Sequence, residues 1–169
     1  MHMAEDFGIY KFDILSQRGL GHIKETVKQV KQNKGVDIDV YQFKKFKEDE
    51  KIKVLMRNSK AMGCFYVESP ATRMLLGKLR CDDYLTLVAA SSIIRPGVAS
   101  SGMMKTYIER FHAVRNGGTY TPIHPKMDEI MKDTYGVMVY QEDVIRVAHL
   151  FAGLTLTEAD VLRRGMSGK

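Results

Sequence analysis

Two adjacent arginines near the end of the chain are of a residue type well suited to bind a polyanion. Arg163 and Arg164 follow Asp160 by three and four positions, and Lys169 comes shortly after them. Neighbouring guanidinium groups offer paired N–H donors that match phosphate oxygens. Asp160 can also pair with both arginines along one helix face, for about 0.2–0.5 kcal/mol per pair. Two interpretations follow, a solvated ion-pair cluster and a clamp for a row of phosphates.

A second candidate lies near the start of the chain, where apolar and polar residues alternate. This alternation predicts a strand over residues 8–15 that places Lys11 and Asp13 together on one face, about 7 Å apart. A carboxylate such as Asp13 is a hard oxygen ligand for Mg²⁺, and Lys11 can contact phosphate. A carboxylate beside a lysine at a strand edge is, however, more commonly a surface ion pair.

The arginine pair belongs to a run, residues 135–169, that predicts two helices joined by a short turn. Gly153 is expected to end the first helix. Thr157 is expected to be the N-cap of the second helix, with Asp160 at its third position completing a capping box. The apolar stripe of the first helix contains Tyr140, Val144, Val147, Ala148 and Phe151.

Helical periodicity recurs in most of the remaining sequence. It predicts a helix over residues 17–33 that Gly35 terminates, one from Pro70 to about Arg80 that Ser69 caps, and one over 84–94 that is apolar on all sides. The residues expected to face the core from the second of these are Met74, Leu75 and Leu79. The expected fold class is mainly α, with one short N-terminal strand.

Composition bounds the kind of protein. The 169 residues are 44% hydrophobic and 27% charged, which is ordinary for a globular domain. No apolar run reaches the roughly 20 residues that a membrane span needs, so no membrane partner is expected. Cys64 and Cys81 form no pairing framework, which favours a cytoplasmic location. The net charge of +6 favours a polyanionic partner.

Several short sequence motifs occur along the chain in the same order as in a known protein family. They are K-F-D at 11–13, E-S at 68–69, R-P-G at 95–97, T-Y-G-V-M-V-Y-Q-E at 134–142 and A-D-V-L-R-R-G-M at 159–166. Together they resemble the fingers region of the bacterial replicative polymerase, the DNA polymerase III alpha subunit of polymerase family C. The resemblance runs from about residue 7 to residue 169 and is weakest over 34–60. Gly165, where this family usually has alanine, is a mild departure.

The resemblance implies two-metal nucleotidyl transfer, in which a primer 3′-hydroxyl attacks the α-phosphate of a dNTP. It implies that Asp13 is a catalytic residue and a magnesium ligand. Arg95, at a helix exit, is a candidate DNA contact and equally fits an arginine that satisfies the terminal carbonyls of the helix. Lys11, Arg163 and Arg164 would bind the triphosphate. The lesser candidates for the nucleotide pocket are Lys169, Gln141, Tyr140 and His149.

The resemblance also implies that the sequence is a fragment, because the other catalytic aspartates of this family have no counterpart in it. Residues 1–6 are interpreted as terminal residues, 7–34 as the end of the palm, 35–62 as a connector and 63–169 as the helical fingers domain. The fragment alone is expected to be inactive and to bind no Mg²⁺. In the intact polymerase the expected partners are Mg²⁺, dNTP, template-primer DNA, the rest of the chain and other replisome subunits.

Two other classes of function fit the same composition. A stand-alone basic helical DNA-binding module would bind DNA with a steep dependence on salt. A helical interaction domain with a merely solvated basic surface would bind DNA weakly or not at all.

Overall fold

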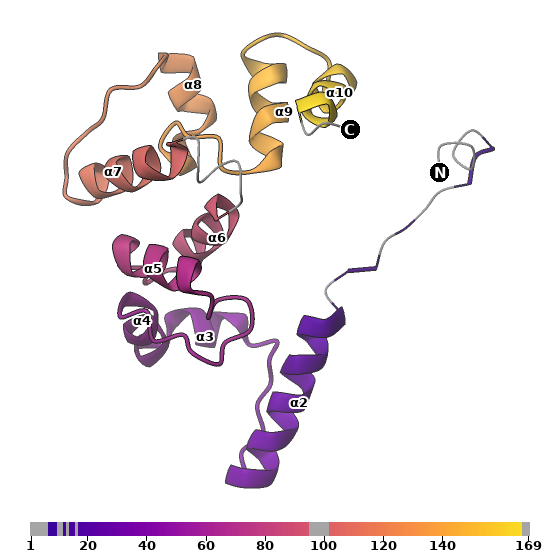
Figure 1. Cartoon of the computed structure of the whole chain (residues 1–169), viewed down its shortest axis with the longest axis vertical. Coiled ribbons are helices and arrows are strands. Elements are labelled where there is room, and N and C mark those ends of the chain that lie inside the picture. Colours follow the sequence, from indigo (N-terminus) through magenta and orange to yellow (C-terminus); the bar gives the residue numbers. More distant parts are fainter. Residues whose placement is uncertain (1–6, 10–11, 13, 16, 95–101, 167–169) are drawn as a thin grey trace. The chain divides into compact units, whose positions relative to one another are not determined.

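The computed structural model describes residues 7–9, 12, 14–15, 17–94 and 102–166. Every regular element within these residues is a helix (Figure 1), which confirms the mainly α fold class. The chain divides into two compact units, Met1–Phe43 and Lys44–Lys169. None of the described helices is long and apolar enough to cross a membrane.

The first unit contains helix α2 (Gln17–Lys34), which confirms the helix predicted over 17–33. Gly35 ends it in a left-handed conformation, with φ of +66°, and donates its N–H to the Lys31 carbonyl at 2.9 Å. No residue of α2 is buried: in its apolar stripe Leu20 and Ile23 are exposed, and Val27 and Val30 are half-buried.

The strand predicted over 8–15 includes residues that the structure does not describe. Tyr10, Lys11 and Asp13 are among these. Phe12 and Ile14 are described, and both are exposed and belong to no strand.

The second unit is built around four helices, α4 (Glu50–Arg57), α5 (Pro70–Leu79), α6 (Tyr84–Ile93) and α7 (Met103–Arg115). Helix α5 packs against each of the other three. The short helix α3 (Phe43–Glu48) places the Lys47 ammonium 3.8 Å from the centre of the Tyr84 ring. The buried core consists of Leu75, Leu76, Leu79, Cys81, Ala89, Ala90, Ile93, Tyr107, Phe111, Val137 and Val139.

Local capping signals set where α5 and α6 begin. The Ser69 hydroxyl accepts a hydrogen bond from the Thr72 N–H at 3.3 Å, and Pro70 occupies the first helical position, as predicted. Asp83 caps α6 by accepting from the Thr86 N–H at 2.8 Å. Both caps satisfy backbone donors that a helix leaves without partners at its start.

The buried face of α5 differs from the predicted one at one residue. Leu75 and Leu79 are fully buried as expected, but Met74 is 52% exposed and Leu76 takes its place in the core. Met74 and Leu76 lie about 200° apart around the helix, since α-helices have about 3.6 residues per turn. The same periodicity therefore permits either residue to face inward, and packing against α6 and α7 selects Leu76.

The apolar pattern of α6 also overstates its burial. Ala89, Ala90 and Ile93 belong to the core, as expected for a core helix. Leu85, however, is 74% exposed. A helix with apolar residues on every face thus buries only the face that meets α5 and the rest of the core.

A cluster of aromatic rings fixes the segment before α9 against α7. The Tyr135 ring lies 5.5 Å from that of Tyr107 and 5.8 Å from that of Phe111, both edge-on. Arg110 of α7 donates to the Tyr135 carbonyl at 2.8 Å. Tyr135 and Gly136 both have positive φ, so the chain turns sharply there after α8 (Pro125–Ile130) and η1 (Lys132–Thr134).

Helices α9 (Gln141–Leu150) and α10 (Leu156–Met166) pack against each other as a hairpin (Figure 1). Gly153 has a φ of +78°, and the next residue, Leu154, donates its N–H to the Ala148 carbonyl at 3.1 Å. This is the glycine-ended helix that the sequence predicts.

The predicted N-cap of α10 is wrong by two residues. Thr155, not Thr157, precedes the helix, and its hydroxyl accepts from the Glu158 N–H at 3.3 Å. Glu158 accepts in return from the Thr155 N–H at 2.8 Å, and hydrogen bonds from Thr155 lower the pKa of its carboxyl. The capping box is therefore Thr155 with Glu158, which leaves Asp160 to pair with arginines.

Alanine substitutions at the two threonines should separate these two caps. Thr155→Ala is expected to lower the free energy of unfolding by about 1 kcal/mol, because it removes an N-cap oxygen. The matched change Thr157→Ala should stay within about 0.5 kcal/mol of the parent chain. Urea unfolding followed by circular dichroism measures both, and a larger loss at Thr157 would contradict the capping box seen here.

Candidate functional site

The two arginines at the end of α10 share one carboxylate. Arg163 donates from Nε and Nη2 to Asp160 Oδ1, at 2.9 and 2.8 Å. Arg164 lies with Nε 3.2 Å from Asp160 Oδ2. Asp160 thus holds both guanidinium groups on one side of the helix, which confirms the ion pairing that their spacing predicts.

The two arginines differ in how much of each side chain is exposed to solvent. The Arg163 side chain is 25% exposed and its Nη1 lies 3.5 Å from Gln141 Oε1 of α9, so it links the two helices. The Arg164 side chain is 56% exposed. Among the described residues its two Nη groups have no partner, so most of the five N–H donors of this guanidinium face solvent.

A buried aspartate that sequence reasoning did not single out fixes the start of α9. Asp143 is 2% exposed, and its Oδ2 accepts from the backbone N–H groups of Val139 and Tyr140, both at 2.9 Å. Its position in the first helical turn, three residues after Tyr140, is the sequence signal that could have found it. Asp143 therefore fixes the backbone at the start of α9, where Gln141 Oε1 lies 3.5 Å from Arg163 Nη1.

Tyr140 faces a cavity rather than the arginines. It is half-buried, and this burial raises the pKa of its hydroxyl. The cavity has a volume of about 730 Å³. Its aromatic walls are Tyr107, Phe111, Tyr120, Tyr135 and Tyr140.

His149 occupies the opposite end of α9. Its Nδ1 lies 2.6 Å from the Leu154 carbonyl, across the turn between the two helices. Eight residues separate it from Gln141, which is about 12 Å along a helix at 1.5 Å per residue. The structure therefore links Arg163 to Gln141 and, through Asp160, to Arg164, whereas Tyr140 lines the cavity and His149 lies at the other end of α9.

The other predicted site residues lie outside the described part of the chain. They are Lys11, Asp13, Arg95 and Lys169. Their assignments to metal, phosphate and DNA stay predictions.

The described residues do not by themselves form a magnesium site. Nowhere among them do three or more histidine, cysteine or acidic side chains gather closely enough to hold a metal ion. A two-metal site needs converging carboxylates, so no chemical step is assigned to a metal bound within these residues.

Comparison with known proteins gives the family. The sequence model of the bacterial DNA polymerase III alpha subunit finger domain matches residues 19–169. This mainly helical chain therefore belongs to that family of finger domains.

Curated relatives carry the name of the whole polymerase subunit. DNA polymerase III subunit alpha of Staphylococcus aureus (strain COL) is 36% identical over all 169 residues of this chain. The protein of that name from Staphylococcus epidermidis is also 36% identical over the same length. The chain spans 15% of the length of each of these relatives.

Proposed function

We propose that the chain acts as the fingers of a replicative DNA-directed DNA polymerase and binds the triphosphate of the incoming dNTP at the end of α10. The observation that carries this proposal is the arrangement of Asp160, Arg163 and Arg164. One carboxylate orients two guanidinium groups, and the Nη groups of Arg164 have no partner among the described residues and belong to a side chain that is 56% exposed.

The electrostatics of this arrangement suit a leaving pyrophosphate. Attack of a primer 3′-hydroxyl on the α-phosphate breaks the bond to the β-phosphate, and negative charge develops on the departing oxygens. Fixed N–H donors aimed at such charge lower the barrier because they need no reorganisation during the reaction. Asp160 holds the guanidinium groups of both arginines in place before a nucleotide binds.

The two arginines have different roles in this proposal. Arg164 donates directly to phosphate oxygens through its exposed Nη groups. Arg163 is a positioning residue that joins the end of α10 to Gln141 and so keeps the two helices in register. The catalytic carboxylates and the magnesium ions belong to the palm, of which Asp13 is the proposed remnant in this chain.

Photoaffinity labelling tests where the triphosphate lies. A dATP derivative with an aryl azide on its γ-phosphate is expected to label the peptide that contains residues 160–166, as mass spectrometry would map it. Unlabelled dATP should prevent this labelling. Equal labelling of lysine-rich peptides from α2 or α4, or labelling that dATP does not reduce, would contradict the assignment.

A further inference from the structure

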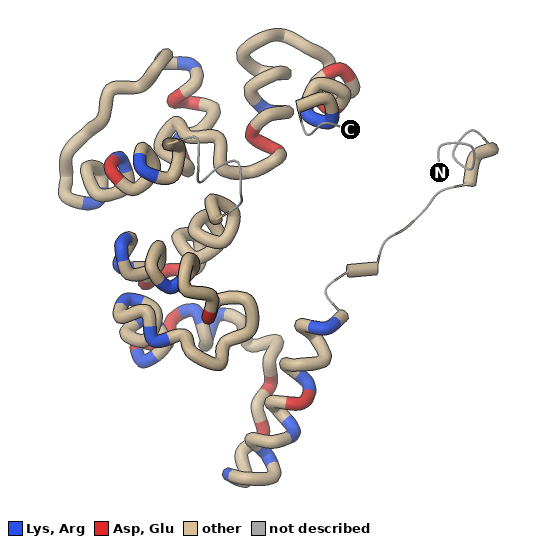
Figure 2. The backbone as a smooth tube through the Cα atoms, viewed as in Figure 1, with Lys and Arg blue, Asp and Glu red and all other residues tan. Residues whose placement is uncertain are grey.

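Several helices of the second unit end around one open groove lined with cations. The groove lies where α4, α5 and α7 end, and its volume is about 640 Å³. The charged and polar side chains that matter here are Arg57, Lys78, Arg80, Asp82, His112 and Arg115. Figure 2 shows Lys and Arg at the ends of these helices.

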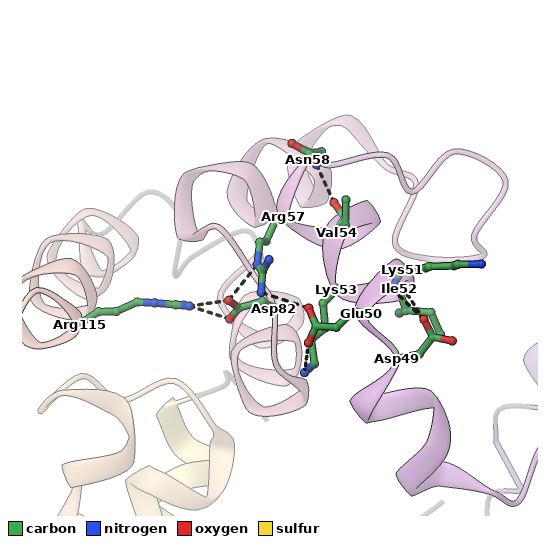
Figure 3. Close-up of polar contacts among 10 residues, drawn as sticks. All are labelled: Asp49, Glu50, Lys51, Ile52, Lys53, Val54, Arg57, Asn58, Asp82 and Arg115. Carbon is green, nitrogen blue, oxygen red and sulfur yellow. Dashed lines mark hydrogen bonds and ion pairs between the residues drawn. The ribbon is translucent and has the colours of Figure 1, made fainter.

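Asp82 lies between two of the arginines and fixes both (Figure 3). Arg115 Nη2 donates to both carboxylate oxygens of Asp82, at 2.8 and 2.7 Å. Arg57 Nε donates to Asp82 Oδ2 at 3.0 Å. The hydrogen bond from Arg115 lowers the pKa of the Asp82 carboxyl, and Arg57 adds to this effect. The side chains of Arg57 and Arg115 are still 40% and 41% exposed, so both present charge to the groove.

The other two cations have no carboxylate to balance them in the described part of the chain. Lys78 and Arg80 are exposed at the end of α5. The backbone around them is fixed, because the Arg80 N–H bonds to the last turn of α5 and the His112 Nε2 lies 2.7 Å from the Lys78 carbonyl. Four cations and one carboxylate, Asp82, thus line the groove, and outside the lining residues Glu50 Oε2 lies 3.9 Å from Arg57 Nη2.

Cations at helix ends have a simpler role, which accounts for part of this cluster. A positive charge in a last helical turn interacts favourably with the helix dipole. Arg57 and Arg115, however, point toward Asp82 rather than toward their own terminal carbonyls. The excess of positive charge at one groove is destabilising unless an anion offsets it, so the helix dipole does not explain why the four cations converge.

We propose that this groove binds the phosphodiester backbone of DNA. Guanidinium forks held in place by a carboxylate match phosphate oxygens in bidentate geometry. Leu79 is the one apolar residue among the groove's described lining residues, so the groove offers little apolar surface for an apolar side chain. Contacts of this kind position a duplex without reading its sequence. The choice of DNA rests on the proposed polymerase function, but the groove uses none of the residues assigned to the triphosphate.

Fluorescence anisotropy with a fluorescein-labelled primer-template duplex, without dNTP, tests the groove across a series of salt concentrations. The double variant Lys78→Ala/Arg80→Ala is expected to bind about tenfold more weakly. Its slope of log affinity against log salt should fall by about 2, because two phosphate contacts are lost. The control Lys105→Ala/Arg146→Ala removes one lysine and one arginine elsewhere and should leave the slope unchanged.

Three results would overturn the proposal. One is an equal decrease of the salt slope in the control variant, which would show that the change in net charge alone causes the effect. Another is competition by polyglutamate as effective as that by unlabelled DNA, which would indicate an acidic protein partner. The third is no binding by the parent chain at low salt. The double variant Arg163→Ala/Arg164→Ala should keep the salt slope of the parent chain. The DNA-binding groove and the triphosphate site can therefore be disproved independently of each other.

Discussion

Replacing Arg164 with alanine should raise the KM for dNTP about tenfold in a complete polymerase that carries this segment. A hydrogen bond to a charged group contributes about 1.5–3 kcal/mol, and about 1.4 kcal/mol corresponds to a factor of ten. Because the Arg164 side chain is more than half exposed, the lower end of this range applies. Adding Arg163→Ala should raise KM further. Steady-state primer extension at varied dNTP concentration measures these changes.

The matched control is Arg146→Ala, an exposed arginine on the partner helix α9. It removes the same charge and the same side chain from the same hairpin, so its KM should stay at the parent value. An equal rise in KM for the Arg146 and Arg164 variants would show that overall charge, not the end of α10, governs nucleotide binding.

Removing the Leu76 side chain should have the largest effect on stability. Leu76 is fully buried at the centre of the second unit, so Leu76→Ala is expected to cost about 2–5 kcal/mol through lost burial and a cavity. The matched change Leu85→Ala, in the neighbouring helix, removes the same atoms from a side chain that is 74% exposed. It should change the free energy of unfolding by less than about 0.5 kcal/mol.

Urea unfolding followed by circular dichroism compares the two leucine variants. Similar losses at Leu76 and Leu85 would mean that the outer face of α6 is buried after all. That result would restore the fully buried helix that its apolar sequence predicts and would contradict the packing described here.

Local signals in the sequence were enough to place several helix ends. Ser69 before Pro70, and the glycines at 35 and 153, each act within one helical turn, so neighbouring residues alone specify them. The cap of α10 shows where such signals compete. The words T-L-T-E and T-E-A-D both fit a capping box, and the structure uses the first because the carboxylate of Asp160 pairs with Arg163 and Arg164 instead.

Other features depend on partners far away in the chain, so local patterns could not predict them. The choice of Leu76 over Met74 is made by α6 and α7. Asp82 meets Arg57 and Arg115, which are 25 and 33 residues from it, and no spacing rule connects them. The pairing of Arg163 with Gln141 likewise follows from the hairpin. The sequence thus predicted the pairing of Asp160 with Arg163 and Arg164 but not the contact with Gln141 that links the two helices.

The central claim is that the end of α10 recognises the phosphates of a nucleotide. Calorimetric titration of the chain with dATP and with dAMP tests it most directly, because the two ligands differ by the β- and γ-phosphates alone. The parent chain should bind dATP at least about tenfold more tightly than dAMP. This preference should disappear in Arg163→Ala/Arg164→Ala and persist in Arg146→Ala. Equal affinity of the parent chain for both nucleotides, or an unchanged preference in the double variant, would contradict the claim.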